Sequence, residues 1–366
     1  MCFLQLLHSF YSDSHSSYII YSFLAKIRIE LPFEQAVSTS IDTNTMMKTF
    51  SIRRTALIWN SRGILVFPGG MGTVNELFEA WTGATDHKVA CPIVIIPHTF
   101  YKPFFDAIKR VGVIERKVIT ESDFNLVVYA NDADEAVQLI QQPMRPKDPG
   151  TQFTLREKLI YLRHELGRGL ATVSSLCPAV VFMGSRYSLS RTDHEVQFIR
   201  KLTTNILTTT SLGIRLGVSG LMNEIVEESM KEASTSDEIE ESRIQRILMT
   251  DEIGAEDVTN AHFESRSAHC ESLLDNAKVA FFVPGDIACL NVLFALVCEI
   301  QTGRRVRMPI YLVGSSFWQP IVDGLEKTLQ GEFDGQYIKY KDLSIMTVIG
   351  TTHTDMSEVM QRIGGL

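Results

Sequence analysis

The sequence predicts an α/β protein made of two tandem, doubly wound parallel-sheet domains. Three observations predict this class. Strand-like apolar runs alternate with helical patterns, one such run passes through a glycine-rich turn straight into a helical segment, and the second half of the chain repeats landmarks of the first. With 366 residues, of which 45% are hydrophobic and 21% charged, the chain is long enough for two hydrophobic cores.

The clearest strand–turn–helix unit lies in the first half of the chain. The apolar run Gly63–Phe67 is typical of a buried parallel strand, and Val74–Thr82 carries apolar side chains at helical spacing. Between them, Gly69, Gly70 and Gly72 permit a close backbone approach. A glycine turn before a helix leaves backbone N–H groups unpaired at the positive end of the helix dipole. The unit therefore predicts an anion site, whose usual occupant is a phosphate monoester.

Two interpretations of Thr73 and Glu76 stay open at this stage. Glu76 lies one turn into the helix, close enough to act on whatever is attached to the phosphate. Alternatively, Thr73-x-x-Glu76 fits a capping box, in which Thr73 caps the helix and Glu76 reaches back to the cap amide. Neither the dinucleotide pattern GxGxxG nor the triphosphate pattern GxxxxGK[ST] is present, which disfavours those two ligand classes.

Composition restricts the compartment and the partners. The formal net charge of −8 argues against broad nucleic-acid binding, because no basic stripe could neutralise a phosphate backbone. No apolar run reaches the ~18 residues of a membrane span, and residues 1–23 lack the basic start of a signal peptide. The six cysteines show no CxxC spacing and the nine histidines no metal-ligand pattern. We expect a cytoplasmic protein with reduced thiols, no metal and no membrane partner.

The two halves of the chain are copies of one another. The following pairs recur at an offset of 216 or 217: Pro68 and Pro284, Leu77 and Leu293, Pro92 and Pro309, and Pro103 and Pro320. A proline-rich stretch between the copies is typical of a linker. We therefore predict a first domain at residues 1–142, a linker at 143–156 and a second domain at 157–366.

The turn carries a motif of known type. Six residues spell PGGxGTxxE: Pro68, Gly69, Gly70, Gly72, Thr73 and Glu76. This motif resembles the signature of the LOG family of nucleotide phosphoribohydrolases, often labelled possible lysine decarboxylases. Arg53, fifteen residues before the motif proline, and Ser61 match further family positions, as does the segment Ile29–Gln35. The resemblance implies a Rossmann-like fold for both copies. It also implies that the first copy is incomplete, because the family's opening strand and first glycine loop should precede Leu24.

The second copy is complete by the same comparison, but its signature is degenerate. The positions of Gly70, Gly72, Thr73, Glu76 and Arg53 are taken there by Asp286, Ala288, Cys289, Val292 and His269. An aspartate would repel a phosphate, and a valine cannot transfer protons. We expect the second copy to be structural or regulatory.

The resemblance implies hydrolysis of the N-glycosidic bond of nucleoside 5′-monophosphates, without a metal or an organic cofactor. Gly69, Gly70, Gly72 and Thr73 would hold the 5′-phosphate. Glu76 would stabilise positive charge on the ribose ring and orient the attacking water. Arg53 would fix the Glu76 carboxylate.

Other outcomes remain open for several residues. Glu34 and Gln35 would line the substrate pocket or begin a helix. Arg53 could instead be a surface cation, and Glu79 is expected to be solvated. The alternative function is a non-catalytic nucleotide-binding or regulatory protein of the same fold. The family resemblance also implies a homo-oligomer.

Overall fold

The computed structural model describes the chain in segments. These are residues 25–29, 43–47, 53–54, 57–58, 61, 63–86, 89, 91–142, 178–185, 190–217, 221–233, 243–249, 261–263, 266–330 and 343–365. The predicted linker, Glu34 and Gln35 lie outside them. The chain divides into two compact units: Met1–Lys102 with Ser122–Gly169 (unit 1), and Pro103–Glu121 with Leu170–Leu366 (unit 2). The predicted boundary between the copies remains a prediction, but residues 103–121 of the first copy belong to unit 2.

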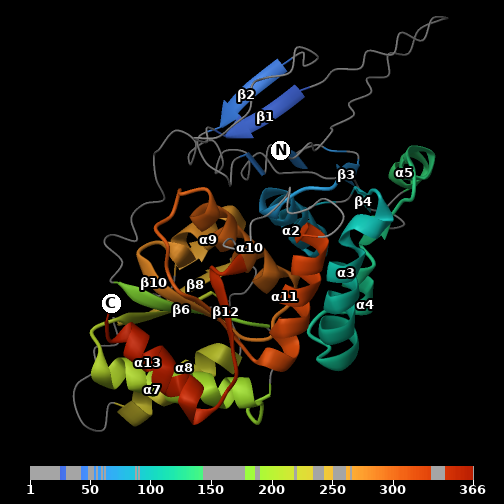
Figure 1. Cartoon of the computed structure of the whole chain (residues 1–366). Helices are drawn as coiled ribbons and strands as arrows, with labels where there is room; N and C mark the ends of the chain where they lie inside the picture. Colours follow the sequence, from blue (N-terminus) through green and yellow to red (C-terminus); the bar gives the residue numbers. More distant parts are fainter. Residues whose placement is uncertain are drawn as a thin grey trace, which may run out of the picture. The chain divides into compact units, whose positions relative to one another are not determined.

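Unit 1 contains two parallel sheets in its described part (Figure 1). One sheet pairs β1 (Ala25–Ile29) with β2 (Thr43–Met47), and the other has the order β3 (Ile64–Val66), β4 (Ile93–Ile95), β5 (Val127–Tyr129). Helix α2 (Met71–Thr85) connects β3 to β4, and α5 (Ala133–Ile140) follows β5. A small core lies between the sheet and α5, formed by Leu65, Val94, Ala130 and Ala136.

Helix α2 is buried on nearly all sides, whereas the sequence predicts an amphipathic helix from Val74 to Thr82. Its apolar residues are buried as expected, but so are Thr73, Asn75, Glu76 and Glu79. One reason is the short helix α4 (Glu121–Phe124). The Trp81 indole donates a hydrogen bond to the carbonyl oxygen of Asp123 at 2.7 Å and packs edge-on against the Phe124 ring. Burial of so many polar side chains requires partners for them within the protein.

The described part of unit 2 contains a seven-stranded sheet, and its neighbouring strands all pair in parallel. Its order is β12 (Met346–Ile349), β11 (Ile310–Val313), β10 (Ala277–Phe282), β6 (Ala179–Met183), β7 (Gly213–Leu216), β8 (Ile244–Met249), β9 (Ala261–Phe263). The chain thus builds outward from β6 to one side and from β10 to the other, which is the doubly wound arrangement. Together with the parallel sheets of unit 1, this confirms the prediction of tandem Rossmann-like domains.

The helices of unit 2 connect these strands. They are α7 (His194–Thr209), α8 (Leu221–Ala233), α9 (Arg266–Leu274), α10 (Ile287–Gln301), α11 (Ser315–Gln330) and α13 (His353–Ile363). The second half of α3 (His98–Ile108) and the π-helix η1 (Lys109–Glu115) also belong to this unit.

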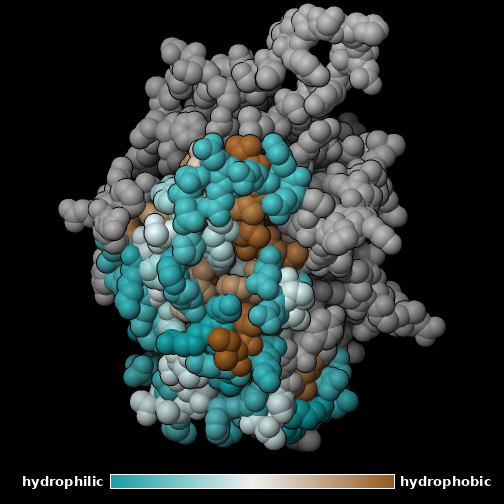
Figure 2. Space-filling view, turned by 90° about the vertical axis from the view of Figure 1, so that its right-hand side faces the viewer, coloured by the Kyte–Doolittle hydropathy of each residue, from teal (hydrophilic) through white to brown (hydrophobic). Residues whose placement is uncertain are grey.

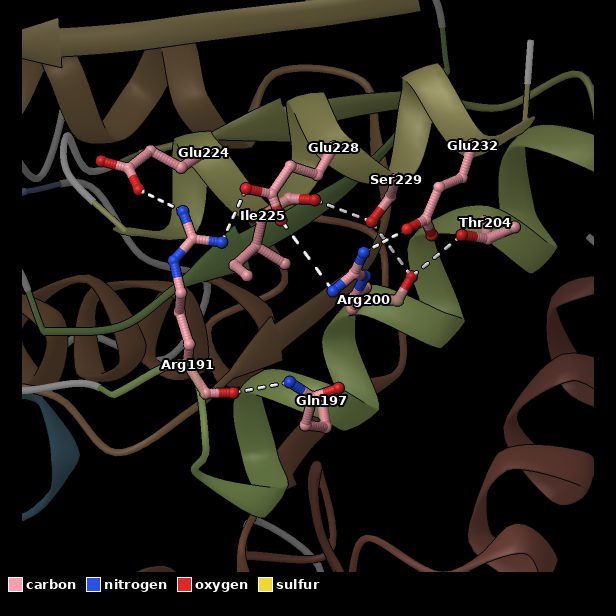
Figure 3. Close-up of polar contacts among 9 residues, drawn as sticks. All are labelled: Arg191, Gln197, Arg200, Thr204, Glu224, Ile225, Glu228, Ser229 and Glu232. Carbon is pink, nitrogen blue, oxygen red and sulfur yellow. Dashed lines mark hydrogen bonds and ion pairs between the residues drawn. The ribbon is translucent and has the colours of Figure 1, made fainter. Parts of the chain in front are cut away.

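Helices α7 and α8 are joined by a ladder of charged side chains (Figure 3). Arg191, just before α7, donates to both Glu224 and Glu228 on α8 at 2.6 Å, and Arg200 on α7 pairs with Glu232. These pairs are mostly exposed, so they specify how the two helices align more than they add to stability.

The copies differ in which strands they contain. β10, β11 and β12 correspond to β3, β4 and β5 at the repeat offset. For example, Ala280 is the first residue of β10 that pairs with β11, and Ile64 is the first residue of β3 that pairs with β4, which gives 280 − 64 = 216. β8 and β9 match β1 and β2 in order and in parallel pairing. β6 and β7, which join β10 to β8 in unit 2, have no counterpart among the described residues of the first copy. Among the described residues of the first copy, the two sheets are separate.

The surface shown in Figure 2 is mainly hydrophilic over the described residues, and apolar residues on it are interrupted by polar ones. Large apolar side chains that are exposed include Ile114, Val137 and Val306. Among the helices that the structure describes, none is both long enough and apolar enough to span a bilayer.

Candidate functional site

The glycine turn and α2 form the centre of the site. The buried strand β3 ends at Val66, and α2 begins at Met71 with Gly70 as its N-cap in extended conformation. Among the residues that the structure describes, no side chain caps this helix. The N-cap residue, a glycine, therefore offers no side-chain acceptor to the backbone N–H groups at the helix start. Such N–H groups can bind an external anion.

The capping-box interpretation of Thr73 and Glu76 is wrong. Thr73 is the third residue of the helix, not its cap, and its amide donates to the carbonyl oxygen of Gly70 at 3.0 Å. The reason is that the two preceding residues already adopt helical backbone, which moves the cap back to Gly70. Of the predicted phosphate donors, Thr73 thus has its amide engaged within the helix.

Gly69 is enclosed on two sides. A Cβ atom at this position would overlap the Oγ1 atom of Thr73, and the hydroxyl of Tyr101 donates to the Gly69 carbonyl oxygen at 3.1 Å. Only glycine fits between these neighbours, so the backbone of the turn is held close to the start of α2.

Arg53 and Glu76 form a partly buried ion pair. Nη1 of Arg53 donates to Oε1 of Glu76, and the two side chains are 13% and 4% exposed. The alternative of Arg53 as a surface cation is therefore wrong. The structure brings together the two residues that the sequence selected for catalysis, although their roles remain a prediction.

The expectation of a solvated Glu79 is also wrong. Glu79 is buried, and its Oε2 lies 3.6 Å from Nε of the buried Arg54. Glu79 follows Glu76 by three positions on α2, so both carboxylates face the helical segment that carries the two arginines. Ser61, another family position, is buried and donates to the Leu57 carbonyl oxygen at 3.0 Å.

Two buried acceptors at the site have no hydrogen bond within the described part of the chain. They are Oε2 of Glu76 and Oδ1 of Asn75. Buried polar atoms without partners are rare and call for a reason. Sequence reasoning missed Asn75, yet the repeat carries a signal for it, because Asn291 stands at the same position of the second copy (291 − 75 = 216).

The equivalent turn of unit 2 has the same close glycine contact but a different N-cap residue. Gly285 lies against Cys289 as Gly69 lies against Thr73. Here, however, the N-cap is Asp286, whose carboxylate accepts a hydrogen bond from the Cys289 amide at 3.0 Å. Burial, together with the nearby Asp286 carboxylate, raises the pKa of the Cys289 thiol well above its ordinary value. A carboxylate of the chain itself thus occupies the helix start.

Both ion pairs of the first copy are replaced by other buried residues in the second. At the offset of 216, Arg53 and Glu76 correspond to His269 and Val292, and Arg54 and Glu79 to Cys270 and Ala295. All four replacements are buried. The fold thus forms around α10 without either arginine–glutamate pair. Over the described residues, no group of three or more histidine, cysteine or acidic side chains is placed to hold a metal ion.

Fold and site together define a doubly wound α/β protein in which a helix start without a side-chain cap among the described residues lies beside a partly buried arginine–glutamate pair. Residues 20–140 match the model of a family described as possible lysine decarboxylase. This match confirms the resemblance to the LOG family over that segment of the chain. Among solved structures, the X-ray structure of TM1055, a structural genomics target, is 18% identical and covers 52% of this chain and 100% of its own, with a TM-score of 0.34. A comparison with curated proteins gave no match.

Proposed function

We propose that the first copy hydrolyses the N-glycosidic bond of nucleoside 5′-monophosphates, releasing the free base and ribose 5-phosphate. The match of residues 20–140 to the family model supports a nucleotide-processing hydrolase at the level of the family. The uncapped start of α2 and the glycine turn support a phosphate as the recognised group.

The observation that carries the proposal is the partly buried ion pair of Arg53 and Glu76. Removing two charges from water is costly, and a buried pair is weak evidence for a stabilising role. The second copy folds with His269 and Val292 in these positions. Retention of the pair beside the glycine turn therefore supports a chemical role.

The chemistry follows from the two oxygens of Glu76. Arg53 donates a hydrogen bond to Oε1, while Oε2 accepts no hydrogen bond from the described residues. As the C1′–N bond breaks, positive charge develops on the ribose ring, and Oε2 stabilises it. Glu76 then accepts a proton from the water whose oxygen bonds to C1′, and the base leaves with the electrons of the broken bond and takes up a proton. No metal or organic cofactor enters these steps.

The location that we propose is the cytoplasm. The described cysteines Cys91, Cys270, Cys289 and Cys298 are buried thiols outside any disulfide, which is typical of a reducing compartment.

The test is product analysis by chromatography after incubation with AMP, GMP, CMP, UMP and IMP. We expect wild type to release a free base from at least one of them, Glu76→Gln to release none, and Asp134→Asn, which changes an exposed carboxylate of unit 1, to behave as wild type. Calorimetric titration with the same nucleotides distinguishes an enzyme from the alternative, a binding protein without catalysis. A protein that binds them without release is the non-catalytic nucleotide-binding protein.

A further inference from the structure

Residues 103–121 come from the first copy but are built into unit 2. They comprise the second half of α3 and the whole of η1, and η1 packs against α11. The repeat makes α3 and α11 equivalent, since Pro103 and Pro320 stand at the offset of 217 and lie inside their helices. Figure 1 shows the two helices side by side. Two equivalent elements of the repeat are thus in contact with each other.

These helices approach each other closely at Gly324. A Cβ atom there would lie 2.7 Å from the carbonyl oxygen of Pro103 and 3.0 Å from Cβ of Ala107. By the repeat offset, the counterpart of Gly324 is Ala107 itself (324 − 217 = 107). In a contact between two copies of one surface, a residue meets its own counterpart only at the twofold axis. The crossing of α3 and α11 therefore has the geometry of a twofold contact.

Apolar and charged contacts surround this crossing. The Phe104 ring meets the Phe294 ring of α10 edge-on, with centroids 5.8 Å apart, and Ile108 and Val111 are fully buried. Beyond η1, Nη2 of Arg116 lies 3.1 Å from Oε2 of Glu195, whose side chain is 6% exposed. Close helix packing, aromatic contact and a partly buried ion pair all anchor the same segment.

We propose that the second copy is the built-in partner of the first. The segment 103–121 docks on α10, α11 and the start of α7 as one half of an internal pseudo-twofold interface. A surface that two separate chains would use to pair is thereby satisfied within one chain. The second copy can have this structural role even though its signature is degenerate. The proposal also predicts that two chains do not pair through this surface, in place of the homo-oligomer implied by the family.

The first experiment distinguishes contacts within a chain from contacts between chains. Amide hydrogen exchange of wild type is followed over a hundredfold dilution, with the molar mass measured by light scattering. We expect strong protection of residues 103–121 that does not change with concentration. Protection that falls on dilution together with the molar mass would place the contact between chains and overturn the proposal, as would an unprotected segment.

The second experiment perturbs the crossing. Gly324→Ala places a Cβ against backbone that cannot yield, whereas Gly365→Ala adds a Cβ at the ordinary distance of 3.7 Å from the nearest carbonyl oxygen, that of Arg362. We expect Gly324→Ala to speed exchange within 103–121 at least tenfold and to leave α13 unchanged, and Gly365→Ala to resemble wild type. Equal exchange in the two variants contradicts the docking.

A milder variant keeps the proposal testable if Gly324→Ala does not fold. Arg116→Ala removes the ion pair to Glu195, while Arg110→Ala changes an exposed arginine of the same segment that pairs only weakly, at 3.8 Å, with Glu115 of η1 itself. Faster exchange of 103–121 in Arg116→Ala alone supports the docking. The same rate in both variants argues against it.

Discussion

Arg53 donates a hydrogen bond to Glu76 across 23 positions of the chain, and the pair lies beside the start of a helix that no side chain caps. The equivalent helix of the second copy has neither the arginine nor the glutamate, and its start is occupied by Asp286. One chain therefore contains both an open and a closed version of the same turn. The closed version serves as an internal reference for which residues the fold itself requires.

The orientation of Glu76 depends on the planar guanidinium of Arg53. Arg53→Lys keeps the positive charge but replaces a planar fork by a single flexible ammonium group. We expect kcat for nucleotide hydrolysis to fall by at least tenfold, with KM and the melting temperature close to wild type. Steady-state kinetics and thermal unfolding measure the two effects. An unchanged kcat would remove Arg53 from the catalytic machinery.

The buried pair of Arg54 and Glu79 gives a prediction about stability. Glu79→Ala leaves the buried Arg54 without this carboxylate, and breaking a buried pair costs about 3–5 kcal/mol. The double variant Arg54→Met with Glu79→Leu removes both charges at similar volume. The second copy also has uncharged residues at these positions, the smaller Cys270 and Ala295. We expect it to be more stable than Glu79→Ala in urea unfolding. If the double variant is the less stable one, the charges themselves stabilise unit 1.

The parts of the fold that the sequence predicts are those with a local signal. Alternating apolar runs and helical patterns predict the parallel sheets, and the glycines predict the turn before α2. Arg53 and Glu76 were selected together through the spacing of the family motif, and the structure places them in contact.

The parts that sequence reasoning missed depend on distant contacts. A glutamate is expected at the surface, and the approach of the distant Arg54 favours the burial of Glu79. The transfer of residues 103–121 to unit 2 has no local pattern at all. Its one trace in the sequence is Gly324, a glycine inside a helix, which is unfavourable unless close packing requires it.

The closed turn of the second copy predicts the stoichiometry of binding. The Asp286 carboxylate accepts a hydrogen bond from the Cys289 amide and so takes the place that a phosphate would need. We therefore expect wild type to bind one nucleoside monophosphate per chain. Asp286→Gly restores the residue type of the first copy, and glycine costs a helix N-terminus only a few tenths of a kcal/mol. We expect calorimetry to detect a second, weaker site for AMP or inorganic phosphate in this variant. Two sites in wild type would show that Asp286 does not close the turn.

The last helix, α13, gives a prediction about pH. Thr352 is its N-cap and forms a capping box with Asp355. The Asp355 amide donates to the Thr352 hydroxyl at 3.2 Å, and the Thr352 amide donates to the Asp355 carboxylate at 2.8 Å. Burial alone would raise the pKa of Asp355, but hydrogen bonds from Thr352 and the Gly350 backbone outweigh it, and the pKa is lowered.

A lowered pKa in the folded state means that the ionised carboxylate stabilises the fold. This contribution is complete above the ordinary aspartate pKa of about 4 and is lost as the pH falls through the lowered pKa of the folded protein. Thr352→Ala removes the cap and should cost about 0.5–2 kcal/mol at pH 7. We expect the difference from wild type in urea unfolding to shrink below pH 4, because protonated Asp355 no longer accepts these hydrogen bonds fully. In an Asp355→Asn background the effect of Thr352→Ala should lose this pH dependence. A cost of Thr352→Ala that is equal at pH 7 and pH 3 would show that the cap acts without the charge of Asp355.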